Sequence, residues 1–111
     1  MKRTTIGELE ELVLLSVGSL YEEAYAVTIL EVIKEYTQRV LDITAIHSVL
    51  RRLEDKGFIT STMGGATKER GGRRKKFFTL SQSGRRVLDE TMEARTALYN
   101  KLPKLIFSGL T

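Results

Sequence analysis

The chain has 111 residues, 41% of them hydrophobic, and its 18 Lys and Arg against 14 Asp and Glu give a formal net charge of +4. This length fits one globular domain with a small core, and the lack of cysteine excludes disulfide and thiol chemistry. No apolar run approaches the ~18 residues that a membrane span needs, so we expect a cytoplasmic protein that does not contact membranes.

Two helices are predicted in the first third of the chain. Acidic residues favour a helix N-terminus, so the glutamates in GELEELVLLSVGSL predict a helix from about Gly7 to Leu20. Its apolar residues are too dense for a surface helix, which indicates a central position. In YEEAYAVTILEVIKEYTQ, residues Ile29, Ile33 and Tyr36 are three or four apart and predict a second helix.

The segment LDITAIHSVLRRLEDKGF gives the clearest helix prediction. Asp42 or Thr44 is suited to cap its start, and Gly57 is suited to end it in the left-handed conformation. Four apolar residues fall on one stripe at helical spacing: Ile46, Val49, Leu50 and Leu53. The opposite face carries Thr44, Ser48, Arg51 and Asp55, flanked by His47 and Arg52.

A β-hairpin is predicted next. Two β-prone runs, residues 58–63 and 76–80, flank a loop that contains four glycines. Basic residues gather on this loop and on the return strand: Lys68, Arg70, Arg73, Arg74, Lys75 and Lys76. Either Phe77 or Phe78 is expected to anchor the return strand to the core.

Ser81 is suited to cap a last helix that continues to about Leu102, before Pro103. Its residues at heptad-like spacing are Leu88, Met92, Arg95, Tyr99 and Leu102. A helix that extends about five turns past the hairpin outruns a small domain. We therefore predict that this face and Leu12 of the first helix form a homodimer interface; the alternative is packing on the chain's own core alone.

The predicted order α-α-α-β-β-α indicates an α+β, mainly α fold, a winged helix-turn-helix with a C-terminal dimerisation helix. In such a fold the third helix enters the major groove of DNA, and the hairpin, or wing, lies along the backbone or the minor groove. We assign residues 1–80 to the DNA-binding domain, residues 81–102 to the dimerisation helix of the same domain, and residues 103–111 to an apolar tail.

The predicted DNA contacts are Thr44, His47, Ser48, Arg51, Arg52, Arg73, Arg74, Lys75 and Lys76. Phosphates attract crowded positive charge, whereas Arg51 is suited to a base edge and Arg52 to a phosphate. The alternatives are a solvated basic loop, and helix-surface arginines that pair with Glu54 or Asp55.

Enzyme chemistry is not indicated. His47 is the only histidine, and the chain has no cysteine to complete a metal site. No nucleophile–base pair or phosphate-binding loop is recognisable. We expect neither catalysis nor a cofactor.

The segments GELEELVLLSV, EAYAVTILEVI, AIHSVLRRLEDKGFI and GGRRKKFFTLSQSGRRVL resemble the PadR family of bacterial transcriptional regulators, in order and spacing, over roughly residues 6–90. The chain departs from the family pattern at three places. His47 and Ser48 stand early in the third helix, where the family usually has a tyrosine that is often followed by proline. Tyr25-Ala26 replaces the usual tyrosine-glycine, and Phe78 stands where the family commonly has tyrosine.

The resemblance implies a homodimeric repressor that binds double-stranded DNA at a palindromic operator. Some relatives release DNA when they bind a small-molecule effector, for which the dimer interface is the expected place. The alternative function is a winged-helix module for protein–protein interaction that does not read DNA.

Overall fold

The computed structural model describes residues 6–64 and 75–103. The elements follow in the order α1 (Glu8–Leu20), the 3-10 turn η1 (Tyr21–Glu23), α2 (Ala26–Thr37), α3 (Ile43–Asp55), β1 (Ile59–Met63), β2 (Lys76–Leu80) and α4 (Gln82–Tyr99). This order confirms the predicted α+β, mainly α fold. The last helix ends at Tyr99, three residues before the predicted end at Leu102.

Side-chain and backbone chemistry at the element ends agrees with the sequence. Asp42 caps α3, because its Oδ1 accepts a hydrogen bond of 3.0 Å from the Thr44 backbone N–H. Gly57, just after α3, has a φ of 80°, which favours glycine. Ser81 caps α4 by accepting a hydrogen bond of 3.0 Å from the Gly84 N–H.

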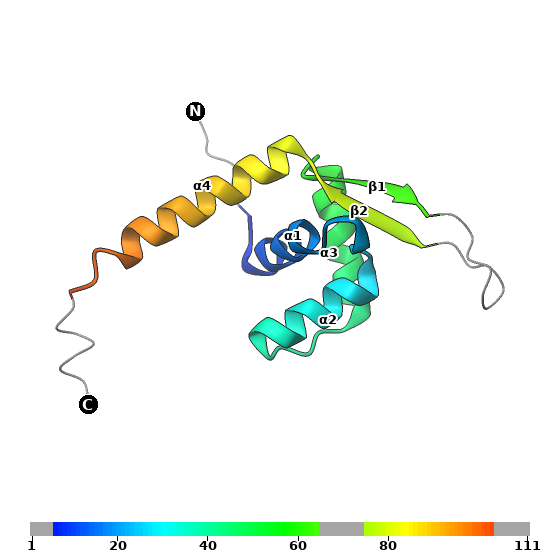
Figure 1. Ribbon diagram of the computed structural model, residues 1–111, viewed down its shortest axis with the longest axis horizontal. Coiled ribbons are helices and arrows are strands. Elements are labelled where there is room, and N and C mark those ends of the chain that lie inside the picture. Colours follow the sequence, from blue (N-terminus) through cyan, green and yellow to red (C-terminus); the bar gives the residue numbers. More distant parts are fainter. Residues whose placement is uncertain (1–5, 65–74, 104–111) are drawn as a thin grey trace.

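The core lies around α1, which sits centrally in the fold, as predicted (Figure 1). The buried hydrophobic residues of the helices are Val13, Leu14 and Val17 of α1, Ile29 and Ile33 of α2, Ile46, Val49, Leu50 and Leu53 of α3, and Val87 and Leu88 of α4. The predicted stripe of α3 is therefore confirmed. Tyr36, in contrast, is 78% exposed, because it borders an open groove between α1 and α2 rather than the core.

The hairpin is antiparallel, with Ile59 opposite Leu80, and it projects from the helical body (Figure 1). Phe78 anchors it: this side chain is only 5% exposed, and the Phe78 N–H donates a hydrogen bond of 2.8 Å to the Ala24 carbonyl oxygen. Phe77 is only partly buried, since neighbouring residues of a strand point to opposite faces.

The first turns of α4 belong to the core, and the rest extends away from the body (Figure 1). Val87 and Leu88 are 3% and 5% exposed, whereas every described residue from 93 onward is exposed. Gly84 allows the close approach of α4 to the hairpin, because a Cβ atom there would overlap the Phe58 carbonyl oxygen. In the described parts of the chain, no helix combines the length and the apolar character that a membrane crossing requires.

Candidate nucleic-acid interface

The predicted DNA-binding residues of α3 all lie on its exposed surface: Thr44, His47, Ser48, Arg51 and Arg52. The buried stripe fixes the rotation of the helix, since Ile46 and Val49 on the other side are 0% and 1% exposed. The polar face of α3 is therefore held outward by packing.

A hollow of about 480 Å³ connects this face with the wing. Among its lining residues are Tyr25 and Val27 at the start of α2, His47, Arg51 and Glu54 of α3, and Lys75, Lys76 and Phe78 at β2. Two groups predicted from separate stretches of sequence thus lie on one side of the molecule. Arg73 and Arg74, also predicted to bind DNA, are outside the described residues, as are Lys68 and Arg70.

Lys75 is held against Tyr25 at the base of the wing. Its Nζ donates a hydrogen bond of 3.2 Å to the Tyr25 hydroxyl and lies 4.3 Å from the centroid of the Tyr25 ring. The Phe77 ring meets the same ring edge-on, with centroids 5.3 Å apart. Tyr25 is partly buried. Tyr25 precedes α2 and Lys75 precedes β2, 50 residues later in the chain, so helical spacing could not predict this contact.

Lys76 is paired with Glu54 of α3. The Lys76 Nζ lies 3.5 Å from Glu54 Oε1, and the Ser61 hydroxyl donates a hydrogen bond of 2.6 Å to Glu54 Oε2. The hydrogen bond from Ser61 holds the pKa of Glu54 below its ordinary value, and the charge of Lys76 lowers it further. The alternative prediction paired Glu54 with an arginine of its own helix, whereas in the structure its cationic partner is Lys76 of the wing.

Arg52 lies at the edge of the exposed face and turns toward α1. Its Nε is 3.7 Å from Oε2 of Glu10, which also accepts a hydrogen bond of 2.8 Å from Lys56 Nζ. Burial opposes ionisation of Glu10, but the hydrogen bonds from Lys56 and the Gly7 N–H, with the charge of Arg52, leave its pKa lowered. Arg52 therefore contacts Glu10, and not Glu54 or Asp55 as the alternative prediction had it. Its contact with phosphate stays a prediction.

Four of the predicted interface residues, on α4 and just after it, fall into two groups. Leu88 lies in the chain's own core and Met92 is half-buried, whereas Tyr99 and Leu102 are 64% and 43% exposed. Leu12 of α1 is partly buried against the core.

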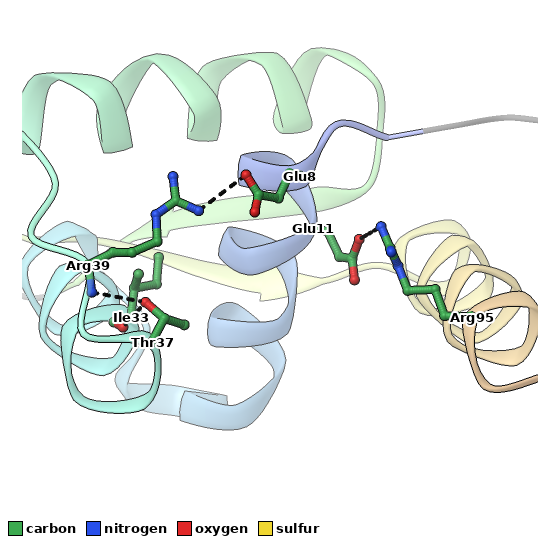
Figure 2. Close-up of polar contacts among 6 residues, drawn as sticks. All are labelled: Glu8, Glu11, Ile33, Thr37, Arg39 and Arg95. Carbon is green, nitrogen blue, oxygen red and sulfur yellow. Dashed lines mark hydrogen bonds and ion pairs between the residues drawn. The ribbon is translucent and has the colours of Figure 1, made fainter. Parts of the chain in front are cut away.

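Two ion pairs connect the first turn of α1 with its surroundings (Figure 2). Arg95 of α4 contacts Glu11, with Nη2 2.8 Å from Oε1. Arg39, between α2 and α3, contacts Glu8, with Nη1 3.2 Å from Oε1. The acidic start of α1 thus contacts both the α2–α3 connection and the outgoing half of α4.

The family model of PadR-like transcriptional regulators matches residues 13–90, which is more than half of the chain. The chain belongs to the PadR-like family. No match was found among curated proteins.

Solved structures with a similar fold include PadR family regulators. A PadR family transcription regulator from Clostridium difficile has a TM-score of 0.71 and 19% sequence identity, with 85% of this chain and 93% of the other covered. A transcriptional regulator from Streptococcus has a TM-score of 0.69 and 22% identity, covering 84% of this chain and 86% of the other. At these identities the likeness establishes the winged-helix fold of this PadR-like chain.

PadR of Bacillus subtilis, solved in complex with operator DNA, has a TM-score of 0.64 and 26% identity. The match covers 76% of this chain but only 46% of that protein, so this PadR-like chain corresponds to about half of its relative.

Within the described residues of this chain, no three His, Cys, Asp or Glu side chains gather as a metal site would require.

Proposed function

We propose that this PadR-like chain is a cytoplasmic, sequence-specific DNA-binding regulator that acts as a homodimeric repressor at a palindromic operator. The observation that carries the proposal is the shared hollow, in which His47 and Arg51 of α3 lie beside Lys75 and Lys76 of the wing. A polyanion that follows this surface would meet the exposed helix face and the wing together. The operator complex of Bacillus subtilis PadR, at 26% identity, supports the same use of this fold.

In this proposal α3 enters the major groove. Arg51 is exposed and would reach the O6 and N7 atoms of a guanine, the commonest specific contact in such complexes. Thr44 and Ser48 lie toward the N-terminal end of the helix, where short side chains can contact bases or phosphates. Lys75 and Lys76 would neutralise phosphates beside the groove, which gives affinity but little sequence information.

The homodimer would form through α4 (within the proposed dimerisation helix, residues 81–102). The outer half of this helix leaves Leu98 68% exposed and Tyr99 64% exposed, and α1 exposes Leu15 at 39%. Burial of these apolar side chains between two copies would stabilise both. Two-fold symmetry would then place two α3 helices in successive major grooves, about 34 Å apart.

A small-molecule effector would have room next to this helix. A second hollow of about 640 Å³ lies between α1, β2 and α4, and Leu15, Leu80 and Met92 are among its lining residues. Its lining joins the exposed side of α1 to the base of α4, so a ligand there would act on the angle between these helices.

The proposal is tested by selecting bound duplexes from random DNA and then measuring affinity for the selected sequence and for random duplex. Arg51→Ala should weaken binding to the selected sequence by about 1–3 kcal/mol and relax its sequence preference. Lys75→Ala should weaken all sequences about equally and flatten the dependence of log affinity on log salt by about 0.9. Arg86→Ala, an exposed arginine on α4, is the matched control and should change neither quantity.

A different result would point to a different function. If the wild-type protein does not bind duplex DNA at low salt, the winged-helix protein-interaction module is favoured. If Arg51→Ala leaves both affinities unchanged while the wild type binds, α3 is not the reading element.

A further inference from the structure

A carboxylate lies inside the basic hollow that we propose faces DNA. Glu54 lines this hollow together with Arg51, Lys75 and Lys76, and its side chain is 35% exposed. A carboxylate so close to DNA phosphates would repel them. Its position therefore needs an explanation within the proposed interface.

The contacts of Glu54 divide between its two oxygen atoms. Oε2 accepts the 2.6 Å hydrogen bond from Ser61 on β1, which joins α3 to the wing by a neutral donor. Oε1 lies 3.5 Å from the Lys76 ammonium. The same ammonium is 5.7 Å from the centroid of the Phe78 ring, so Lys76 is held between a carboxylate and an aromatic face.

We propose that Glu54 is an internal counter-ion for Lys76, and that a DNA phosphate displaces the Glu54 carboxylate from Lys76 when the protein binds DNA. This inference rests on the proposed DNA-binding function. The Lys76 side chain is 52% exposed, so a phosphate can approach it without moving the backbone. A phosphate oxygen takes the place of Oε1, while Oε2 keeps its bond to Ser61. Glu54 thus sets the strength of the phosphate contact at Lys76 and acts as a positioning residue for the wing.

Glu54→Gln is the informative substitution. The amide oxygen of glutamine can still accept the hydrogen bond from Ser61, whereas the charge that holds Lys76 is removed. With wild-type protein, Glu54→Gln, Lys76→Gln and the double variant, affinity for a random-sequence duplex is measured over a series of salt concentrations. Glu54→Gln should tighten binding about three- to fivefold at low salt and steepen the salt dependence by up to about 0.9.

Comparing Glu54→Gln in the wild type and in the Lys76→Gln variant shows whether its effect on DNA affinity depends on Lys76. In the Lys76→Gln background, Glu54→Gln should change affinity much less, because the displaced pair no longer exists. Asp55→Asn is the matched control: it removes a neighbouring carboxylate of α3 but leaves the Glu54–Lys76 pair. Asp55→Asn should change DNA affinity by the same factor in the wild type and in the Lys76→Gln variant.

Three results overturn the inference while leaving the proposed function intact. The first is wild-type DNA binding that Glu54→Gln leaves unchanged or weakens. The second is an equal effect of Glu54→Gln with and without Lys76. The third is found by NMR titration of the free protein, in which Lys76→Gln should raise the pKa of Glu54; an unchanged pKa rules out the pair. If the wild type binds no duplex, the proposed function fails and the inference falls with it.

Discussion

The Nζ atom of Lys75 lies 3.2 Å from the Tyr25 hydroxyl and 4.3 Å from the centroid of the Tyr25 ring. This contact joins the base of the wing to the start of α2, and Phe77 reinforces it edge-on. The tyrosine ring, more than its hydroxyl, makes these contacts, because both a cation–π and an edge-to-face interaction need the aromatic ring.

Substitutions at Tyr25 should separate the ring from the hydroxyl. Tyr25→Leu removes both and should lower the free energy of unfolding by about 1–2 kcal/mol. Tyr25→Phe keeps the ring and should cost less than about half of that. Urea denaturation measures both. Tyr36→Leu, at a 78% exposed tyrosine of α2, should have little effect. Equal losses for Tyr25→Phe and Tyr25→Leu would contradict the role of the ring.

Features encoded by local spacing could be predicted from the sequence. The buried stripe of α3, the caps at Asp42 and Ser81, and the left-handed Gly57 depend on residues within one or two helical turns. The exposed face of α3 follows from its buried stripe, so the candidate α3 residues could be found in the same way.

The partners of the charged side chains could not be predicted. Glu54 pairs with Lys76, Arg52 with Glu10 and Arg95 with Glu11, which is 84 residues away. Each pair joins two elements whose relative placement depends on packing of the whole core. Within the chain, helical spacing offers Arg52 only the carboxylates of its own helix, Glu54 and Asp55. Heptad-like spacing likewise places Arg95 on the predicted interface face but does not indicate its ion pair with Glu11 of α1.

Glu10 should make stability depend on pH. Its folded-state pKa is lowered from the ordinary value of 4.5, so ionised Glu10 stabilises the fold fully above that value. This stabilisation is lost as the pH falls through the lower, folded-state pKa. Glu10→Gln should therefore lower the free energy of unfolding by about 1–2 kcal/mol at neutral pH, and the difference from wild type should shrink below about pH 4.5.

Glu54 also has a lowered pKa, so wild-type stability alone cannot isolate Glu10. Denaturation of Glu10→Gln and wild type across the same pH series isolates it, because Glu54 is present in both. A difference that stays constant down to the lowest pH would show that the loss comes from packing rather than from charge.

Gly84 should tolerate no side chain. Its Cβ would overlap the Phe58 carbonyl oxygen and lie 3.0 Å from Leu80 Cδ1, so Gly84→Ala must push α4 away from the hairpin. We expect a loss of about 2–3 kcal/mol in the free energy of unfolding. Gly18→Ala is the matched control in α1: its Cβ would lie 3.4 Å from Leu80 Cδ2, and alanine favours the helix by about 0.5–1 kcal/mol. Urea denaturation at fixed protein concentration should show a lower free energy of unfolding for Gly84→Ala and a higher one for Gly18→Ala. A Gly84→Ala variant as stable as the wild type would show that α4 packs loosely on the hairpin.

The outer half of α4 should control self-association if the proposed dimer forms there. Leu98 is 68% exposed in a single chain, so Leu98→Lys should hardly change the stability of a monomer. In a dimer interface, however, the substitution would bury a charge. We expect sedimentation velocity to show a shift toward monomer. The melting temperature of the wild type should rise with protein concentration, because association stabilises only the folded state, and this rise should be weaker in Leu98→Lys. Lys34→Ala, at an exposed position of α2 outside the proposed interface, should leave both measurements unchanged. A wild-type dimer that Leu98→Lys does not weaken would place the interface elsewhere, and the spacing of the two α3 helices would no longer follow from α4.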